Sequence, residues 1–208
     1  MGFMKGRKKR PRKTVAHRKR PVHDGRHPVH VTLRVRRDLP NLRSYKVAQI
    51  IGRLMRALVG RAGKVRVTHF SIQSNHLHLL VEADDTSALS KGMQGLVSLL
   101  ARTINGQIGR RGSVFRERYH AHPLKSPTEV RRALVYVLQN VRKHSDEPQT
   151  GIDPCSSARW FNGWHGIRPS ADPPPVSPAR TWLLREGWQR AGGLLRAEEQ
   201  PKPICAGP

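Results

Sequence analysis

The sequence is short of acidic residues, cysteines, aromatic residues and long apolar runs. Only 14 Asp and Glu oppose 39 Lys and Arg among 208 residues, which leaves a formal net charge of +25. The two cysteines, Cys155 and Cys205, lie far apart without a CxxC spacing, and this excludes a disulfide scaffold or a cysteine-based zinc site. No apolar run approaches membrane-spanning length, and no apolar segment follows the basic N-terminus. We therefore expect a cytoplasmic protein without a membrane partner.

The excess of positive charge predicts a polyanionic partner, and nucleic acid is the usual one. Residues 1–20 carry ten Lys and Arg and no acidic residue, so subtracting these ten from +25 still leaves +15 on the rest of the chain. We interpret residues 1–27 as a basic, disordered arm that adds salt-sensitive phosphate contacts. The remaining charge predicts a basic face on the folded domain itself.

Residues 28–147 have the periodicity of one α+β domain. The pattern predicts a strand from residue 29 to 36, a helix from Val47 to about Gly60, and two strands joined by a turn, Val65–Gln73 and His76–Glu82. A second helix, capped by Thr86 or Ser87, follows. The domain then continues with a strand Ser113–Leu124 and a helix from Ser126 to about His144. The order β-α-β-β-α-β followed by a further helix is the ferredoxin-like arrangement, an antiparallel sheet with helices packed on it. Charges in Ser113–Leu124 favour an edge position for that strand.

Residues 148–208 form a Pro-rich and Trp-containing C-terminal extension. Pro169–Pro178 has the composition of a linker, and a short helix with Trp182 and Trp188 is expected to dock back on the core. For the segment of Trp160 and Trp164, packing is favoured over contact with DNA.

One strand carries a His-Leu-His motif. Because strand side chains alternate, His76 and His78 share one face while Leu77 and Leu79 share the other. Two imidazoles at this spacing have Cα atoms about 7 Å apart and can converge on one metal ion. Spacing alone favours the plainer interpretation, a pair of surface or hydrogen-bonded histidines.

The last predicted helix has a clear start and one unusual face. Ser126 is its expected N-cap, with proline in the first turn and Glu129 at N3. Its buried stripe leaves Tyr136 and Asn140 one turn apart on the opposite, polar side. Judged alone, this tyrosine is most simply an exposed residue on a solvated helix face.

Together the two motifs favour chemistry on nucleic acid. A tyrosine hydroxyl with a pKa near 10 needs an activated target or a partner that removes its proton. A divalent ion can withdraw charge from a phosphate oxygen, and histidines with an amide oxygen form a mixed site that suits Mg²⁺ or Mn²⁺. The basic surface, the histidine pair and the tyrosine therefore predict an enzyme that cuts nucleic acid.

Four segments, in order, resemble the single-tyrosine HUH transposases of the IS200-like family, and especially the REP-associated tyrosine transposase branch. The segments are Val29–Arg34, Ser74–Val81, Val114–His120 and Tyr136–Asn140, within a likeness that covers about residues 28–144. On this resemblance, residues 28–147 are an HUH transposase or nuclease domain. It implies a ferredoxin-like fold with the tyrosine helix packed beside the His-Leu-His strand.

The resemblance also implies the roles of single residues. It assigns His76 and His78 as ligands of Mg²⁺ or Mn²⁺, Tyr136 as the nucleophile and Asn140 as the third ligand, with Gln139 its close competitor. Many relatives continue this helix with Asn-Pro, whereas valine follows Asn140 here, a departure that concerns the helix end.

The implied reaction is a transesterification on single-stranded DNA, as in DNA transposition and recombination. Tyr136 is expected to attack the scissile phosphate, which leaves a 5′-phosphotyrosine and a free 3′-hydroxyl, and reversal with another 3′-hydroxyl rejoins the strand. Relatives recognise imperfect hairpins, so single-stranded or hairpin DNA is the expected partner. Because relatives pair the tyrosine with the histidines of their own or of a partner subunit, a homodimer is one expected assembly.

Three other interpretations stay open at this point. A non-catalytic, basic nucleic-acid-binding protein with a ferredoxin-like fold explains the charge, but it leaves the pairing of Tyr136 with Asn140 to chance. Such binders also place aromatic residues on the central strands, which here present His, Thr and Arg. A replication initiator or relaxase would be larger, and a domesticated transposase has the same sequence features.

Overall fold

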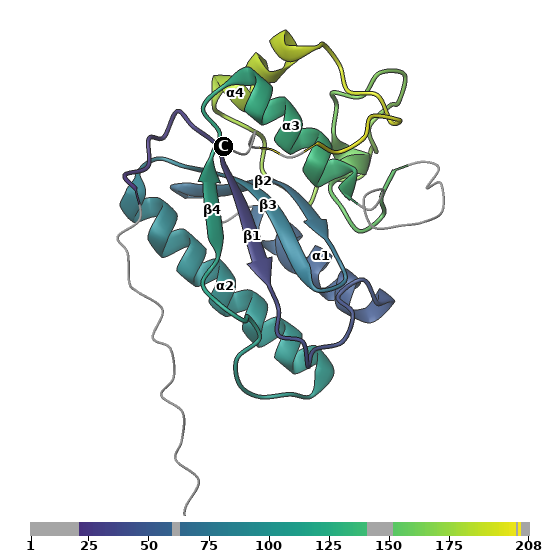
Figure 1. The fold of residues 1–208 in the computed structure, drawn as a ribbon. Coiled ribbons are helices and arrows are strands. Elements are labelled where there is room, and N and C mark those ends of the chain that lie inside the picture. Colours follow the sequence, from purple (N-terminus) through teal and green to yellow (C-terminus); the bar gives the residue numbers. More distant parts are fainter. Residues whose placement is uncertain (1–20, 60–62, 141–151, 203, 205–208) are drawn as a thin grey trace, which may run out of the picture.

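The computed structural model describes residues 21–59, 63–140, 152–202 and 204. Its elements are β1 (Val29–Arg34), α1 (Tyr45–Val59), β2 (Val65–Ile72), β3 (His76–Ala83), α2 (Thr86–Ile108), β4 (His120–Pro123), α3 (Pro127–Leu138) and the short α4 (Trp182–Arg185), with 3₁₀ turns at Ala158–Trp160 and Gly187–Ala191. The sheet order is β2-β3-β1-β4 and every neighbouring pair is antiparallel (Figure 1). This confirms the predicted α+β class and the ferredoxin-like order. No described helix combines the length and apolarity that crossing a membrane requires.

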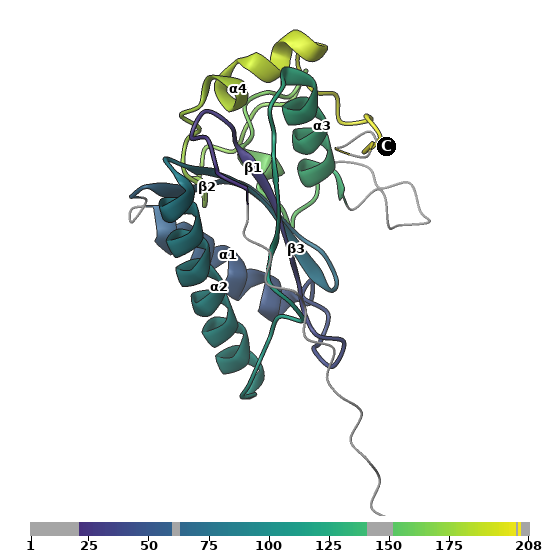
Figure 2. The ribbon, with the colours of Figure 1, turned by 60° about the vertical axis from the view of Figure 1, so that its left-hand side comes forward.

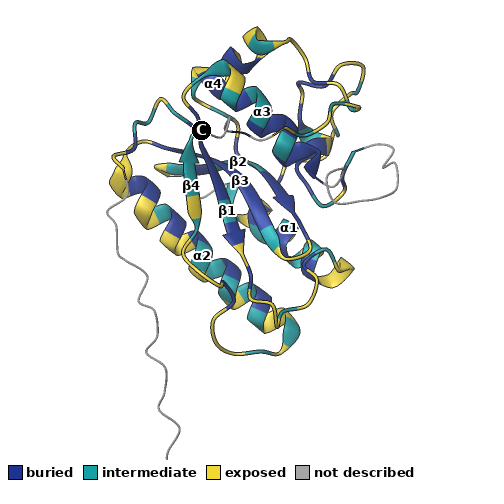
Figure 3. Cartoon of the chain, in the orientation of Figure 1, coloured by how far each residue is buried: buried dark blue, intermediate teal, exposed yellow. Residues whose placement is uncertain are grey.

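The sheet separates two layers of helices. Helices α1 and α2 lie on one side of it, while α3 and α4 lie on the other (Figure 2). The central strands β1 and β3 are largely buried, the edge strand β4 is partly exposed, and the outward sides of α1 and α2 are exposed (Figure 3). Alternation in the strands produces this arrangement, because Val29, Val31 and Leu33 of β1 point into the core with α1 and α2.

The first helical layer follows the helical periodicity of the sequence. The apolar stripe of α2 consists of Leu89, Met93, Leu96, Val97, Leu100 and Ile104; all are buried except Val97, which packs against the same core. The predicted caps of α2 were wrong: the N-cap is Asp85, whose carboxylate accepts the Ala88 N–H at 2.8 Å. The hydroxyl of Thr86 is occupied elsewhere, since it accepts the backbone N–H of His23 at 2.8 Å. The sequence pattern could not foresee that second contact.

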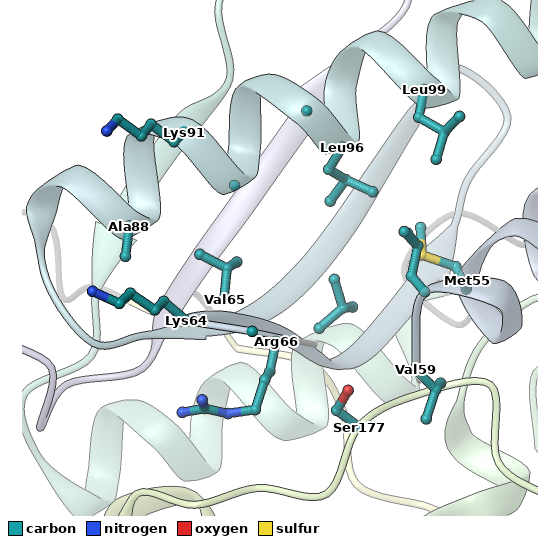
Figure 4. A pocket seen from close by; sticks show the side chains of 15 residues that line it. Met55, Val59, Lys64, Val65, Arg66, Ala88, Lys91, Leu96, Leu99 and Ser177 are labelled. Carbon is teal, nitrogen blue, oxygen red and sulfur yellow. The ribbon is translucent and has the colours of Figure 1, made fainter. Parts of the chain in front are cut away.

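An apolar cavity of about 420 Å³ lies between the end of α1, the start of β2 and α2. Met55, Val65 and Leu96 are among its lining residues, and Lys64 and Lys91 lie toward one end (Figure 4). Close by, α2 approaches β2 so tightly that a Cβ atom at Gly92 would lie 2.4 Å from a methyl carbon of Val65. The described lining residues include no carboxylate and no imidazole, and the cavity opens toward the exposed Lys64 and Lys91.

Strand β4 is shorter than predicted. It lies at the sheet edge as expected, but only His120–Pro123 form it, against the predicted Ser113–Leu124. Before β4, Phe115 makes a bridge to Val35, and residues 116–118 are an exposed bend. Three consecutive charged residues there have no strand on their outer side to pair with, so they turn to solvent.

Helix α3 begins as predicted and ends early. Ser126 accepts the Glu129 N–H, and the Glu129 carboxylate accepts the Ser126 N–H, which completes the capping box. The helix was expected to reach about His144, but it ends at Leu138 with Gln139 as its C-cap. The side-chain amide of Gln139 donates to the carbonyl of Arg196 at 2.8 Å. Helix α3 therefore ends at the residue that contacts the C-terminal extension. The expected continuation beyond residue 140 lies outside the described residues.

The C-terminal extension packs on the outer side of α3. Phe161, Trp164 and Trp188 join the apolar cluster that contains the buried residues of α3. The indole N–H of Trp164 donates to the Ala158 carbonyl at 2.8 Å. This confirms that Trp164 packs and that the short helical segment docks on the core, although Trp182 itself stays 44 % exposed. The predicted division near residue 147 lies outside the described residues.

Both ends of the described chain are tied to β3 and its surroundings. His23 is buried and its Nε2 lies 3.0 Å from the Ala83 carbonyl, so the part of residues 1–27 from His23 onward packs against the domain, while residues 1–20 lie outside the described residues. In the extension, the backbone N–H groups of Arg180 and Thr181 and the Thr181 hydroxyl donate to the buried carboxylate of Glu82. These contacts hold distant segments on one sheet.

Candidate active site

Five histidines gather on the sheet face that α3 covers. We call it the histidine face; its members are His30, His76, His78, His120 and His122. Antiparallel pairing sets Thr32 opposite both His78 and His120, and His30 opposite His122. Directly paired residues point to the same side of a sheet, so alternation along three strands assembles this face. Only two of its histidines, His76 and His78, are predicted from the sequence to be functional.

His76 and His78 lie together. Their ring centroids are 4.6 Å apart and the ring planes are nearly perpendicular. The Nδ1 atom of His76 is 2.7 Å from the side-chain oxygen of Asn75, and an amide oxygen can only accept, so Nδ1 carries the proton. The Nε2 atom of His76 is therefore the nitrogen with a lone pair that a metal ion can use.

His78 is held in the same way by residues of β1. Its Nδ1 atom lies 3.0 Å from Nε2 of His30 and 3.2 Å from the hydroxyl of Thr32. The rings of His30 and His78 are stacked with centroids 5.1 Å apart. With Nδ1 engaged by these two groups, Nε2 is the atom of His78 that can coordinate a metal ion.

His30 is a neutral residue that sequence reasoning missed as a site residue. Burial lowers the pKa of His30 to about 3, and the nearby imidazoles of His122, His120 and His76 add to this effect. At neutral pH its ring therefore carries one proton and keeps one acceptor nitrogen for His78. Alternation already puts His30 on the side of Thr32, and that was the signal that could have identified it.

Tyr136 of α3 faces these histidines within the same chain. The centroid of its ring lies 5.0 Å from that of His78 and 5.9 Å from that of His30, both edge to face. The expectation of a solvated polar side was wrong, because this side of α3 lies on the histidine face and the other side lies under the extension. The tyrosine is half-buried, while its neighbours Val135 and Val137 are buried.

Asn140 and Gln139 turn out to be in different situations. Gln139 is the helix cap and its amide group donates to Arg196, so it serves the extension. Asn140 lies just beyond the helix end and is fully buried. Neither polar atom of its amide has a hydrogen-bond partner among the described residues, so no hydrogen bond joins it to the histidines. The predicted spacing of one helical turn between Tyr136 and Asn140 is interrupted by the cap.

The donor types of the predicted ligands are those of a mixed divalent-cation site. Among the described residues, no group of three or more His, Cys, Asp and Glu side chains is placed to hold a metal ion. A site here would use two imidazole nitrogens and the amide oxygen of Asn140. A buried amide without a partner is costly, by about 1–3 kcal/mol, and a ligand would remove that cost. The chemistry of this donor set suits Mg²⁺ or Mn²⁺ with positions left for phosphate oxygens.

Comparison with known proteins gives one family. The model of the family described as "Transposase IS200 like" matches residues 26–140, which include the whole sheet, α1 to α3 and the candidate site. Among solved structures, the chain is similar to a REP-associated tyrosine transposase bound to a REP hairpin. The sequence identity is 16 % and the TM-score is 0.47. The match covers 63 % of this chain and 75 % of that chain. No curated protein matches.

Proposed function

The chain belongs to the IS200-like transposase family, which are DNA strand-transfer enzymes, and we propose that it cuts and rejoins single-stranded DNA through a covalent bond to Tyr136. The observation that carries this proposal is the Tyr136 ring lying 5.0 Å from the His78 ring, centroid to centroid, within one chain. Packing on both sides of α3 restricts where that ring can go. The nucleophile therefore acts with the histidines of its own subunit.

The proposed step exchanges one phosphodiester for another. The phenolic oxygen of Tyr136 attacks the scissile phosphorus, an O–P bond forms, and the bond from phosphorus to the 3′-oxygen breaks. The phenol loses its proton and the departing 3′-oxygen gains one, so charge and atoms balance. The DNA is left with a 5′-phosphotyrosine on the enzyme and a free 3′-hydroxyl. Attack by another 3′-hydroxyl reverses the step, so the reaction needs no high-energy cofactor.

His76, His78 and Asn140 are the proposed ligands of the cation. When bound, Mg²⁺ or Mn²⁺ would withdraw charge from a phosphate oxygen and make the phosphorus a better target. The chain prepares for this by holding Nδ1 of His76 on Asn75 and Nδ1 of His78 on β1, so that each Nε2 keeps its lone pair.

Hairpin-associated DNA is the proposed partner. The net charge of +25 supports a nucleic acid in general, and the hairpin is inferred from the family. In a hairpin the unpaired flank offers the single strand that a covalent step on one strand requires.

A covalent adduct on a denaturing gel tests the proposal. The full chain is incubated with labelled single-stranded hairpin DNA and Mg²⁺ or Mn²⁺. We expect a protein–DNA band that is lost in Tyr136→Phe and kept in Tyr119→Phe, the matched control in the loop before β4. An adduct that persists in Tyr136→Phe would overturn the assignment of the nucleophile. No adduct across many hairpins would instead favour a non-catalytic nucleic-acid-binding protein.

A further inference from the structure

A basic groove of about 690 Å³ runs between α1 and the C-terminal extension. One wall is a row of α1 side chains one turn apart, Tyr45, Gln49, Arg53 and Arg56. The opposite wall includes Arg159 and Trp160 of the extension. These walls use the outward side of α1, away from the apolar core.

The groove and the candidate active site lie on opposite sides of the sheet but meet at the same end of it. Ile72, the last residue of β2, lines the groove and pairs with Leu77, which directly follows His76. Between them the Gln73 N–H donates to the His76 carbonyl at 2.9 Å. A strand of nucleic acid that leaves the histidine face at this end can therefore continue along α1.

The positive charge in the groove is not all neutralised. Arg43 is held by Asp153 and Arg159 by Asp172. Arg53 and Arg56 are exposed and make no ion pair with a carboxylate in the described ranges; Arg53 only donates to Gln49 at 3.1 Å. Two such guanidinium groups on one helix face attract successive phosphates, and the attraction weakens as salt increases.

Aromatic rings accompany these charges. The side chain of Tyr45 is 76 % exposed at the start of α1, an unusual exposure for a large apolar ring. Across the groove, the guanidinium carbon of Arg159 lies 4.7 Å from the centre of the Trp160 ring. Exposed rings and arginine planes stack on unpaired bases, whereas a duplex hides the faces of its bases. The combination therefore selects a single strand.

We propose that this groove binds an unpaired segment of DNA that extends from the active site, with its phosphates on Arg53 and Arg56 and a base on Tyr45. The proposal rests on the proposed function in taking DNA as the partner. It assigns to α1 a role in binding that is separate from the covalent chemistry on the histidine face.

Gly52 provides a sharp test, because it lies in the groove and a Cβ atom there would meet nothing within 4 Å. Gly52→Glu therefore adds an acidic side chain without a clash, and it replaces glycine by a better helix former. Gly106→Glu is the matched control: it adds the same charge to α2, again with nothing within 4 Å of the new Cβ. Binding of labelled oligo-dT to the full chain is measured by fluorescence anisotropy in EDTA at several salt concentrations.

We expect Gly52→Glu to weaken oligo-dT binding about tenfold at low salt and to reduce the slope of log K against log salt by about 0.7 for each phosphate that the groove no longer neutralises. Gly106→Glu should stay within about twofold of the wild type, since its charge is outside the groove. Tyr45→Ala should weaken binding without changing the slope, because it removes stacking and no charge.

Equal binding by Gly52→Glu and Gly106→Glu would overturn the proposal. So would a decrease in Gly52→Glu that is as large for a blunt duplex as for oligo-dT. Because the assay contains no divalent metal, it is independent of the covalent step. If Gly52→Glu weakens oligo-dT binding but the wild type forms no covalent adduct, DNA binding in the groove is supported and the proposed function is rejected. If the wild type forms the adduct but Gly52→Glu binds oligo-dT normally, the proposed function is supported and binding in the groove is rejected.

Discussion

The two faces of the sheet come from the same strands and have opposite chemistry. Toward α1 and α2, residues such as Val31 and Leu79 are fully buried among other apolar side chains. Toward α3, the positions between them hold His30 and His78, which are nearly as deeply buried, at 7 % and 3 % exposure, but are polar. Burial of apolar groups stabilises the fold, whereas buried polar groups are costly unless they are hydrogen-bonded. The apolar face therefore supplies stability, and the histidine face can stay buried because His30 and His78 are hydrogen-bonded to each other.

The histidine face is covered in a different way from the apolar face. Helices α1 and α2 follow the strands closely in the sequence, but the cover over α3 comes from the C-terminal extension. Ion pairs join the extension to the domain across long stretches of chain, Arg43 to Asp153 and Arg131 to Glu199. The cover of α3 therefore depends on contacts between residues that lie far apart in the sequence.

The largest change in stability is expected from substitution of Glu82, whose carboxylate holds the C-terminal extension on the histidine face side of the sheet. Glu82→Ala removes the acceptor of Arg180 and Thr181 and takes from the buried Arg66 the one of its two carboxylates that is itself buried, so unfolding should become easier by about 3–5 kcal/mol. Asp84→Ala is the control: this half-exposed carboxylate lies 3.6 Å from the same Arg66, and its removal should change stability by at most about 1 kcal/mol. Urea denaturation of both variants measures this. Similar changes in the two variants would show that Glu82 is not the anchor.

Substitutions at two neighbouring residues of β3, one on each face of the sheet, compare the two faces directly. Leu79→Ala should destabilise the protein by about 2–5 kcal/mol, because Leu79 is fully buried in the apolar core. His78→Ala should destabilise the protein less, by about 1–3 kcal/mol, because it removes the hydrogen-bond partner of the buried His30 but little apolar packing. The same variant should form almost no covalent adduct. If His78→Ala unfolds as easily as Leu79→Ala, the histidine face contributes to stability and the contrast fails.

The smallest of these effects concerns the orientation of His78 by His30. His30→Phe keeps a ring and removes the acceptor for Nδ1 of His78, so affinity for Mn²⁺ should decrease about 10–100-fold. His30→Gln restores an acceptor and should recover part of the affinity. His69→Phe is the control, since His69 is a histidine of β2 that contacts Ser157 and Phe161 instead. Calorimetric titration with Mn²⁺ gives the affinities, and equal affinity in His30→Phe and His69→Phe would contradict this role.

Local pattern was enough for the elements whose partners are near in the sequence. The stripes of α1 and α2 and the Ser126 capping box all follow from side chains within a few residues of one another. Prediction failed where a distant residue intervened. Gln139 ends α3 at a contact with Arg196, and the hydroxyl of Thr86, expected as a cap, accepts from His23 instead. No periodicity within a helix contains such information.

The candidate site divides in the same way. Alternation alone put His76 and His78 on one face, and helix periodicity alone set Tyr136 apart from the buried stripe. That these residues meet, with His30 behind them and Asn140 buried beyond the helix end, depends on α3 crossing the sheet under a C-terminal cover. Residue spacing sets the direction of a side chain relative to its own element. Only the packing of elements, which follows from the total apolar area they bury, sets what that side chain faces.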